Sequence, residues 1–259
     1  MFTKKTIQQC SRPGLGARTL LAVLIAGAVQ PNFAATAKSP TFDSPEQAVE
    51  ALYTAVKNDD QAAISGIIGP LASSADITRD KTDREQFIRK YSEMHRLVKK
   101  ADGTTMLCIG AENWPFPVPL VSSNGKWRFD LDAGAQEIVF RRIGDNEETA
   151  IETSRAIAQA LIHANAKTDD NAVNQYVQKV VATPNPTESF HEYYFLLLRT
   201  STGTVVVGYP SQYGSTGVMT FAATPDGAVY EKDLGPKSGQ LVHSMMQYKP
   251  DRTWYVAEQ

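Results

Sequence analysis

The chain has 259 residues, of which 42% are hydrophobic, and a formal net charge of −2 at pH 7. Residues 1–37 contain four of its 26 basic residues and none of its 28 acidic ones, so the remaining 222 residues carry a charge of −6. This acidic balance argues against a nucleic-acid binder or a protein of anionic membrane surfaces, and the length allows one large domain or two small ones.

Residues 1–37 are predicted to be a secretory signal peptide of the bacterial type. A basic segment without acidic residues precedes the uncharged run Leu20–Val29, and residues 35–37 (Ala-Thr-Ala) fit the A-x-A cleavage rule. The ten-residue run is well short of the roughly 20 residues that span a bilayer, which makes an uncleaved anchor the weaker alternative. We therefore expect a periplasmic protein with no membrane span after cleavage, processed after residue 37, 35 or 34.

The two cysteines fall in different segments. Cys10 would leave with the signal peptide, so the mature protein would keep Cys108 alone and form no intramolecular disulfide. Cys108 lies in an apolar, strand-like run with no adjacent base, which favours a buried and inert thiol over a catalytic one.

Residues 38–144 are predicted to form helices followed by antiparallel strands. The sequence from Ser44 to Gln47 is a capping box with proline at the first helical position, and apolar residues follow it at helical spacing. A second short helix is expected over 62–68. A third is expected to open with a capping box at residues 82–85 and to continue through Val98.

Strands are expected next along the chain. Residues 104–110 form one apolar run, and the alternating prolines of residues 113–119 predict an extended segment outside a central strand. Asn124-Gly125 predicts a tight hairpin with a return strand over 126–131. A helix over 133–142, ending near Gly144, closes this first unit.

Residues 145–259 are predicted to form a long helix followed by an antiparallel sheet. Apolar residues repeat at helical spacing over 146–166, and a further helix is expected over 173–181. The expected strands are Tyr193–Leu198, Val205–Val207, Val218–Ala222 and Ala228–Glu231, with a turn at Pro225-Asp226-Gly227 and a closing helix near Leu241–Met246. The order helices, strands, helices, strands predicts an α+β protein in two units.

No motif predicts a catalytic, cofactor-binding or metal-binding residue. The four histidines form no metal-ligand pair, the glycine-containing loop 211–217 lacks the lysine of a phosphate loop, and residues 167–171 lack the spacing of a calcium loop. Four carboxylates are interpreted as solvated surface: Asp130, Asp132, Glu147 and Glu148.

Aromatic residues of the first unit form the candidate binding surface. Tyr53, Trp114, Phe116, Trp127 and Phe129 pack as core in one interpretation, and line an apolar pocket or a partner surface in the other.

Two further residues belong to this candidate pocket, Tyr91 and His95. Together with Asp130 they are also the first candidates for an acid–base site in a cleft of the first unit, because catalytic groups assemble from distant positions in the sequence.

Several motifs resemble the domain of unknown function 2950 family. They are Asn113–Val121, Gly125–Asp130 and Arg141–Glu147, followed by Tyr209-Pro210, Tyr213-Gly214, Gly217–Phe221, Asp226-Gly227 and Asp233–Gly235. The family comprises exported bacterial proteins with no assigned activity, so the resemblance implies export and an intact domain and implies no catalytic residue. Members usually carry a longer insert before the strand at Tyr193, where this chain has the short segment 183–190.

Two weaker resemblances concern the fold. Residues 42–131 resemble a nuclear-transport-factor-2-like or cystatin-like cone, and residues 146–235 are similar to the globular head of type IV pilins. The apolar N-terminal segment lacks the acidic residue of a pilin stem, which argues against filament assembly.

The leading hypothesis is an exported, soluble, non-catalytic protein. Its first unit would hold a small apolar ligand, and its second unit would offer a sheet edge to an envelope protein. The alternative is a periplasmic enzyme with an acid–base site in the first unit's cleft, and a purely structural envelope component is a third hypothesis.

Overall fold

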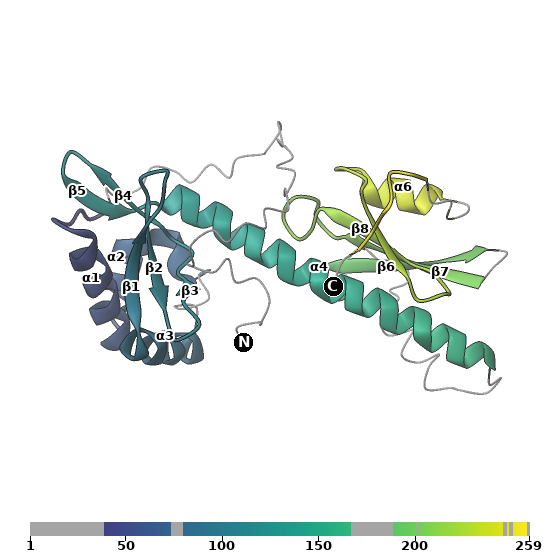
Figure 1. Ribbon diagram of the computed structural model, residues 1–259, viewed down its shortest axis with the longest axis horizontal. Helices are drawn as coiled ribbons and strands as arrows, with labels where there is room; N and C mark the ends of the chain where they lie inside the picture. Colours follow the sequence, from purple (N-terminus) through teal and green to yellow (C-terminus); the bar gives the residue numbers. More distant parts are fainter. Residues whose placement is uncertain are drawn as a thin grey trace. The chain divides into compact units, whose positions relative to one another are not determined.

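The computed structural model of the chain has an α+β fold that divides into two compact units, Met1–Ile138 and Val139–Gln259 (Figure 1). The structure describes residues 39–73, 80–166, 189–200, 203–245, 248 and 251–257. The predicted signal peptide and the helix predicted over 173–181 lie outside these residues. Within them, no helix is long and apolar enough to cross a membrane.

The first unit packs helices against a five-stranded antiparallel sheet. The sheet order is β1-β2-β4-β5, with β3 paired to β2 beside β4. The helical elements are α1 (Pro45–Lys57), α2 (Gln61–Ile68), η1 (Gly69–Ser73) and α3 (Lys81–Glu93). The strands are β1 (His95–Lys99), β2 (Thr105–Ile109), β3 (Trp114–Pro115), β4 (Leu120–Ser123) and β5 (Lys126–Phe129).

Helix α1 begins where the sequence predicts. The Ser44 side chain accepts a hydrogen bond from the Gln47 backbone N–H, and Pro45 occupies the first turn. The Gln47 side chain accepts from the N–H of Asp43, so the reciprocal bond of the capping box reaches one residue further back than expected.

The third helix begins slightly earlier and ends earlier than predicted. It is capped by Asp80, whose carboxylate accepts from the Asp83 N–H, and Thr82 lies inside the helix. It ends at Glu93, and the residues up to Lys99 form β1 instead of a last helical turn. These residues form a strand because each of them pairs with a residue of the apolar strand β2.

The hairpin between β4 and β5 confirms the local prediction. Asn124 and Gly125 both have positive φ, 52° and 73°, as a two-residue type I′ turn requires. The proline-rich segment is mostly extended, but Trp114 and Pro115 pair with β2 as a short strand at the side of the sheet, where the missing proline N–H costs no ladder bond.

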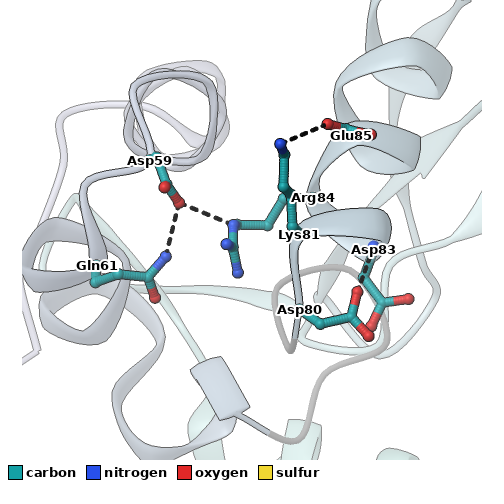
Figure 2. A network of polar contacts seen from close by, with 7 residues as sticks. All are labelled: Asp59, Gln61, Asp80, Lys81, Asp83, Arg84 and Glu85. Atoms are coloured by element: carbon teal, nitrogen blue, oxygen red, sulfur yellow. Dashed lines mark hydrogen bonds and ion pairs between the residues drawn. The ribbon is translucent and has the colours of Figure 1, made fainter.

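A polar network fastens the turn after α1 to the start of α3 (Figure 2). The Arg84 Nε lies 2.9 Å from the Asp59 carboxylate, which also accepts a 3.0 Å hydrogen bond from the Gln61 side chain. Asp59 has a positive φ of 55°, a conformation that Asp tolerates better than most residues. Because the Asp59 side chain is exposed to solvent, this ion pair stabilises the first unit by at most about 1 kcal/mol. The apolar core therefore contributes most of the stability of the unit.

One continuous helix joins the predicted pair at Gly144. Helix α4 runs from Leu131 to Ala166, and the break predicted between residues 142 and 146 is wrong. A glycine inside a helix costs only about 1 kcal/mol, which tertiary contacts can offset. Asn146 supplies one such contact, because its side chain donates to the Thr216 carbonyl oxygen at 2.8 Å.

The second unit is an antiparallel meander in the order β10-β9-β8-β7-β6. Its strands are β6 (Tyr193–Thr200), β7 (Gly203–Pro210), β8 (Met219–Ala223), β9 (Val229–Asp233) and β10 (Tyr255–Val256), and α6 (Ser238–Ser244) is the closing helix. The four predicted strands and the closing helix are present, and the short β10 is an addition.

The two faces of this second sheet carry separate apolar clusters. Ala150, Ile157 and Ala158 of α4 pack with one set of alternating strand residues, which includes Phe195 and Phe221. The other face packs with α6 and with Tyr248. Successive side chains along these strands point to opposite faces of the sheet, so each face has its own apolar cluster.

Cys108 is fully buried in β2. In the structure of the full chain Cys108 is disulfide-bonded, so the lone thiol predicted for the mature protein stays a prediction. The other cysteine of the sequence, Cys10, lies outside the described residues.

Candidate functional site

A groove of about 940 Å³ in the first unit is the candidate site. It lies between helix α1 on one side and the end of α3 with the start of β1 on the other, and the first residues of α2 close one end. Its lining from α1 and the following turn is Glu46, Gln47, Val49, Glu50, Ala51, Thr54, Ala55 and Asn58. The rest of the lining is Asp60, Ala63, Tyr91, His95, Arg96 and Leu97.

Three stacked rings lie at this groove. The Tyr91 ring is parallel to Tyr53 at 4.3 Å between centroids on one side and to His95 at 3.9 Å on the other. Two different elements, α1 and α3, supply the tyrosines, and His95 is the first residue of β1. The change from helix to strand after Glu93 thus sets the position of the imidazole.

Tyr91 and His95 of this stack also make hydrogen bonds. The Tyr91 hydroxyl donates to the Glu50 carboxylate at 3.3 Å, and burial together with that carboxylate raises the pKa of Tyr91. The His95 Nδ1 lies 2.9 Å from the Tyr91 carbonyl oxygen. A carbonyl oxygen only accepts, so Nδ1 is the donor of this hydrogen bond.

The charges of the groove are mostly negative. Glu46 and Glu50 are one helical turn apart on the same side of α1, and Asp60 opens α2. The basic side chain in the lining is Arg96, with His95 beside it. Apolar surface from Val49, Ala51, Ala55 and Leu97 lies between these charges.

The structure brings together only some of the residues singled out from the sequence. Tyr91 and His95 line the groove and Tyr53 stacks behind them. Trp114, Phe116 and Phe129 lie in the hydrophobic core, where they are 9%, 0% and 1% exposed. Trp127 is partly buried against the same core and pairs through its backbone with Phe42.

Asp130 does not join the proposed acid–base set. Its carboxylate accepts a 3.3 Å hydrogen bond from the Ala133 N–H at the start of α4, and it is not among the residues that line the groove. Glu50 is the carboxylate that contacts Tyr91, and it is not among the residues predicted from the sequence. The only signal for Glu50 is its spacing of four residues from Glu46 on a predicted helix.

A second polar cluster, in the other unit, is structural. Glu147 was expected to be solvated surface, but it is largely buried and accepts hydrogen bonds from the backbone N–H groups of Val218 (2.8 Å) and Met219 (2.9 Å). Burial raises its pKa, although these two hydrogen bonds work in the opposite direction. Tyr193 donates to the Met219 carbonyl oxygen at 3.0 Å, so the cluster holds the loop before β8 against α4.

Replacement of Glu147 by Gln is expected to change how stability depends on pH. Because the folded-state pKa lies above the ordinary 4.5, the folded protein holds this proton more tightly than the unfolded chain does. The contribution of Glu147 is therefore greatest below pH 4.5 and is lost as the pH rises through the folded-state pKa. Urea midpoints at a series of pH values should fall more steeply over this range for wild type than for Glu147→Gln.

The control for this prediction is Glu152→Gln on the same helix, where the side chain is exposed. Its stability should follow the wild-type pH profile. Parallel profiles for Glu147→Gln and wild type would contradict a raised pKa at Glu147.

Among the described residues, no group of three or more histidine, cysteine or acidic side chains is close enough to hold a metal ion. No curated protein and no solved structure matches this chain. The cone-like and pilin-head-like resemblances of the two units therefore stay predictions. The model of one family, described as protein of unknown function (DUF2950), matches residues 39–191 and 191–257. The motifs of both units and this match agree: the chain belongs to the domain of unknown function 2950 family.

Proposed function

We propose that the protein is exported to the periplasm and acts there as a non-catalytic binding protein, with the groove beside α1 as its ligand site. The groove and its stacked rings carry this proposal. Tyr91 and His95 form a flat, hydrogen-bonded wall, and the acidic side of α1 faces the same space. Concave sites with apolar surface and a few placed polar groups are typical of ligand sites.

The position of the ligand differs from the sequence hypothesis. Trp114, Phe116 and Phe129 fill the interior of the first unit, so an apolar ligand has no room among them. The groove is open at the surface and carries charge, which favours a ligand with polar or cationic groups over a purely apolar one.

The chemistry of the groove favours binding over acid–base catalysis. Tyr91 has a raised pKa and stays protonated at neutral pH, so it can donate a hydrogen bond but cannot accept a proton. Asp130, the expected partner in the enzyme hypothesis, caps α4 instead.

The binding proposal is tested by titration of the protein with lipids, glycans and peptides. Nuclear magnetic resonance of imidazole-labelled protein separates His95, which lines the groove, from the other three histidines of the chain, His163, His191 and His243. We expect at least one ligand class to shift His95 while the other three signals stay in place. If no class shifts His95, the groove is not a ligand site.

Export predicts a definite mass for the mature protein. Removal of residues 1–37 leaves a chain of 222 residues that begins at Lys38. Protein collected from the periplasmic fraction should have the mass of this shorter chain. A mass that includes the first 37 residues, or absence of the protein from the periplasmic fraction, would contradict the proposal.

A further inference from the structure

One wall of the groove is the outer edge of a β-sheet. Among the described strands, β1 is terminal in its sheet and pairs only with β2. Three consecutive residues of β1, His95, Arg96 and Leu97, line the groove. Consecutive strand residues point to opposite faces, so a space that all three line runs along the edge of the strand.

The hydrogen-bond register shows which backbone groups face this edge. The Gly110 N–H donates to the Met94 carbonyl oxygen and the Lys100 N–H to the Thr104 carbonyl oxygen, both at 2.8 Å, at the two ends of the β1–β2 ladder. Hydrogen-bonded pairs alternate along an antiparallel ladder. Arg96 and Val98 therefore bond to β2, and the N–H and C=O groups of His95 and Leu97 point the other way.

These outward groups have no described backbone partner. In the part of the chain that the structure describes, no backbone hydrogen bond reaches His95 or Leu97 from the outer side of β1. A row of unpaired N–H and C=O groups is a template for an added strand. Residues of α1 line the groove together with this edge of β1.

The charge of the opposite wall selects the occupant. Glu46 and Glu50 on α1, with Asp60 at one end, face the space that an added strand would fill. An extended peptide places alternate side chains on one face, so basic residues at every second position would meet these carboxylates.

We propose, on the basis of the binding function above, that the groove takes an extended basic peptide segment as an added strand on β1. The peptide backbone pairs with the N–H and C=O groups of His95 and Leu97. Its lysine or arginine side chains lie toward Glu46 and Glu50, and its other side chains lie against Val49 and Leu97.

The probe is a short, end-blocked peptide of alternating valine and lysine. Its binding should protect the amide protons of His95 and Leu97 from hydrogen exchange. The amides of Arg96 and Val98, already bonded to β2, should be protected before and after. Binding that leaves the exchange of His95 and Leu97 unchanged would overturn strand addition.

Two altered peptides separate backbone pairing from charge. N-methylation of alternate residues on the pairing edge removes the donated hydrogen bonds and should weaken binding by about tenfold or more. Replacement of the lysines by glutamates should abolish it. Equal binding of the methylated peptide or of the acidic peptide would overturn the proposal.

Variants of the protein test the same contacts. Leu97→Pro removes an N–H from the outer edge and leaves the β2 ladder intact, so the variant should fold and lose strand addition. Glu46→Gln should weaken binding about twofold to fivefold, and this loss should shrink at high salt. Glu85→Gln, an exposed carboxylate of α3 outside the groove, is the matched control and should bind normally.

The titrations of His95 also distinguish strand addition from the more general binding function. If a lipid or glycan shifts His95 and no peptide does, strand addition is wrong and the binding function stands. If no ligand of any class shifts His95, both are wrong.

Discussion

Gly217→Ala is expected to destabilise the second unit strongly. A Cβ atom at position 217 would lie 2.0 Å from the Tyr193 hydroxyl oxygen and 2.6 Å from the ring carbon that carries it. The Tyr193 ring is 0% exposed, and its hydroxyl donates to the Met219 carbonyl oxygen, so it has no free space to move into. Overpacking of this kind costs about 1–3 kcal/mol, and loss of the hydrogen bond adds to it.

The measurement is urea unfolding followed by hydrogen exchange with mass spectrometry, which reports each unit from its own peptides. The second unit should unfold at a lower urea concentration, while the first unit keeps its midpoint. Gly66→Ala is the control, because this exposed position of α2 has no atom within 4 Å of the new Cβ. It should stabilise α2 by about 0.5–1 kcal/mol. An unchanged midpoint for Gly217→Ala would show that Tyr193 does not pack against the glycine.

Phe116→Ala is expected to cost the first unit about 3–5 kcal/mol. The ring is fully buried and packs at 5.9 Å from Phe129 and 6.3 Å from Phe87, measured between centroids. The Phe116 N–H also bonds to the Leu107 carbonyl oxygen, so the backbone cannot collapse into the cavity that the substitution leaves. The loss should appear as an earlier urea transition of the first unit.

The same variant decides between the two sequence interpretations of the aromatic residues. As a core residue, Phe116 should affect stability and leave ligand binding by the folded protein unchanged. As a pocket residue, it should weaken binding. Phe140→Ala is the matched control, because that ring is 60% exposed and its removal should change stability by no more than about 0.5 kcal/mol.

Local chemistry made several elements of the fold predictable. Ser44 and Pro45 begin α1 through bonds within one turn, and Asn124-Gly125 builds its hairpin from two positive φ angles. In the second unit, Val205–Val207 form the continuous apolar run that burial on both faces of a sheet requires. These features depend on residues a few positions apart, and a single sequence contains that information.

The secondary-structure predictions that are wrong concern residues whose conformation depends on contacts with another segment of the chain. Residues 95–98 have a pattern compatible with helix, but pairing with β2 makes them a strand. Gly144 would end an isolated helix, whereas Asn146 and Glu147 bond to the loop before β8 and keep α4 continuous. Neither partner can be identified from the segment itself.

The candidate site was only partly predictable for the same reason. Tyr91 and His95 were singled out, but Glu50, which bonds to Tyr91 from another helix, was not. Trp114, Phe116 and Phe129 look alike in the sequence whether they fill a core or line a pocket. Their burial decides between the two, and burial depends on every element packed around them.

The sequence by itself determined the α+β class, the family and most helix and strand positions, because caps, turns and periodicity act over short distances along the chain. Only the tertiary structure decided that β1 is an edge strand with His95 and Leu97 facing outward, and that the acidic side of α1 lies across the groove from it. The reason is physical: the register of β1 comes from its pairing with β2, and the opposing charge comes from α1, some forty residues earlier in the chain. Both arrangements exist only once the chain is packed.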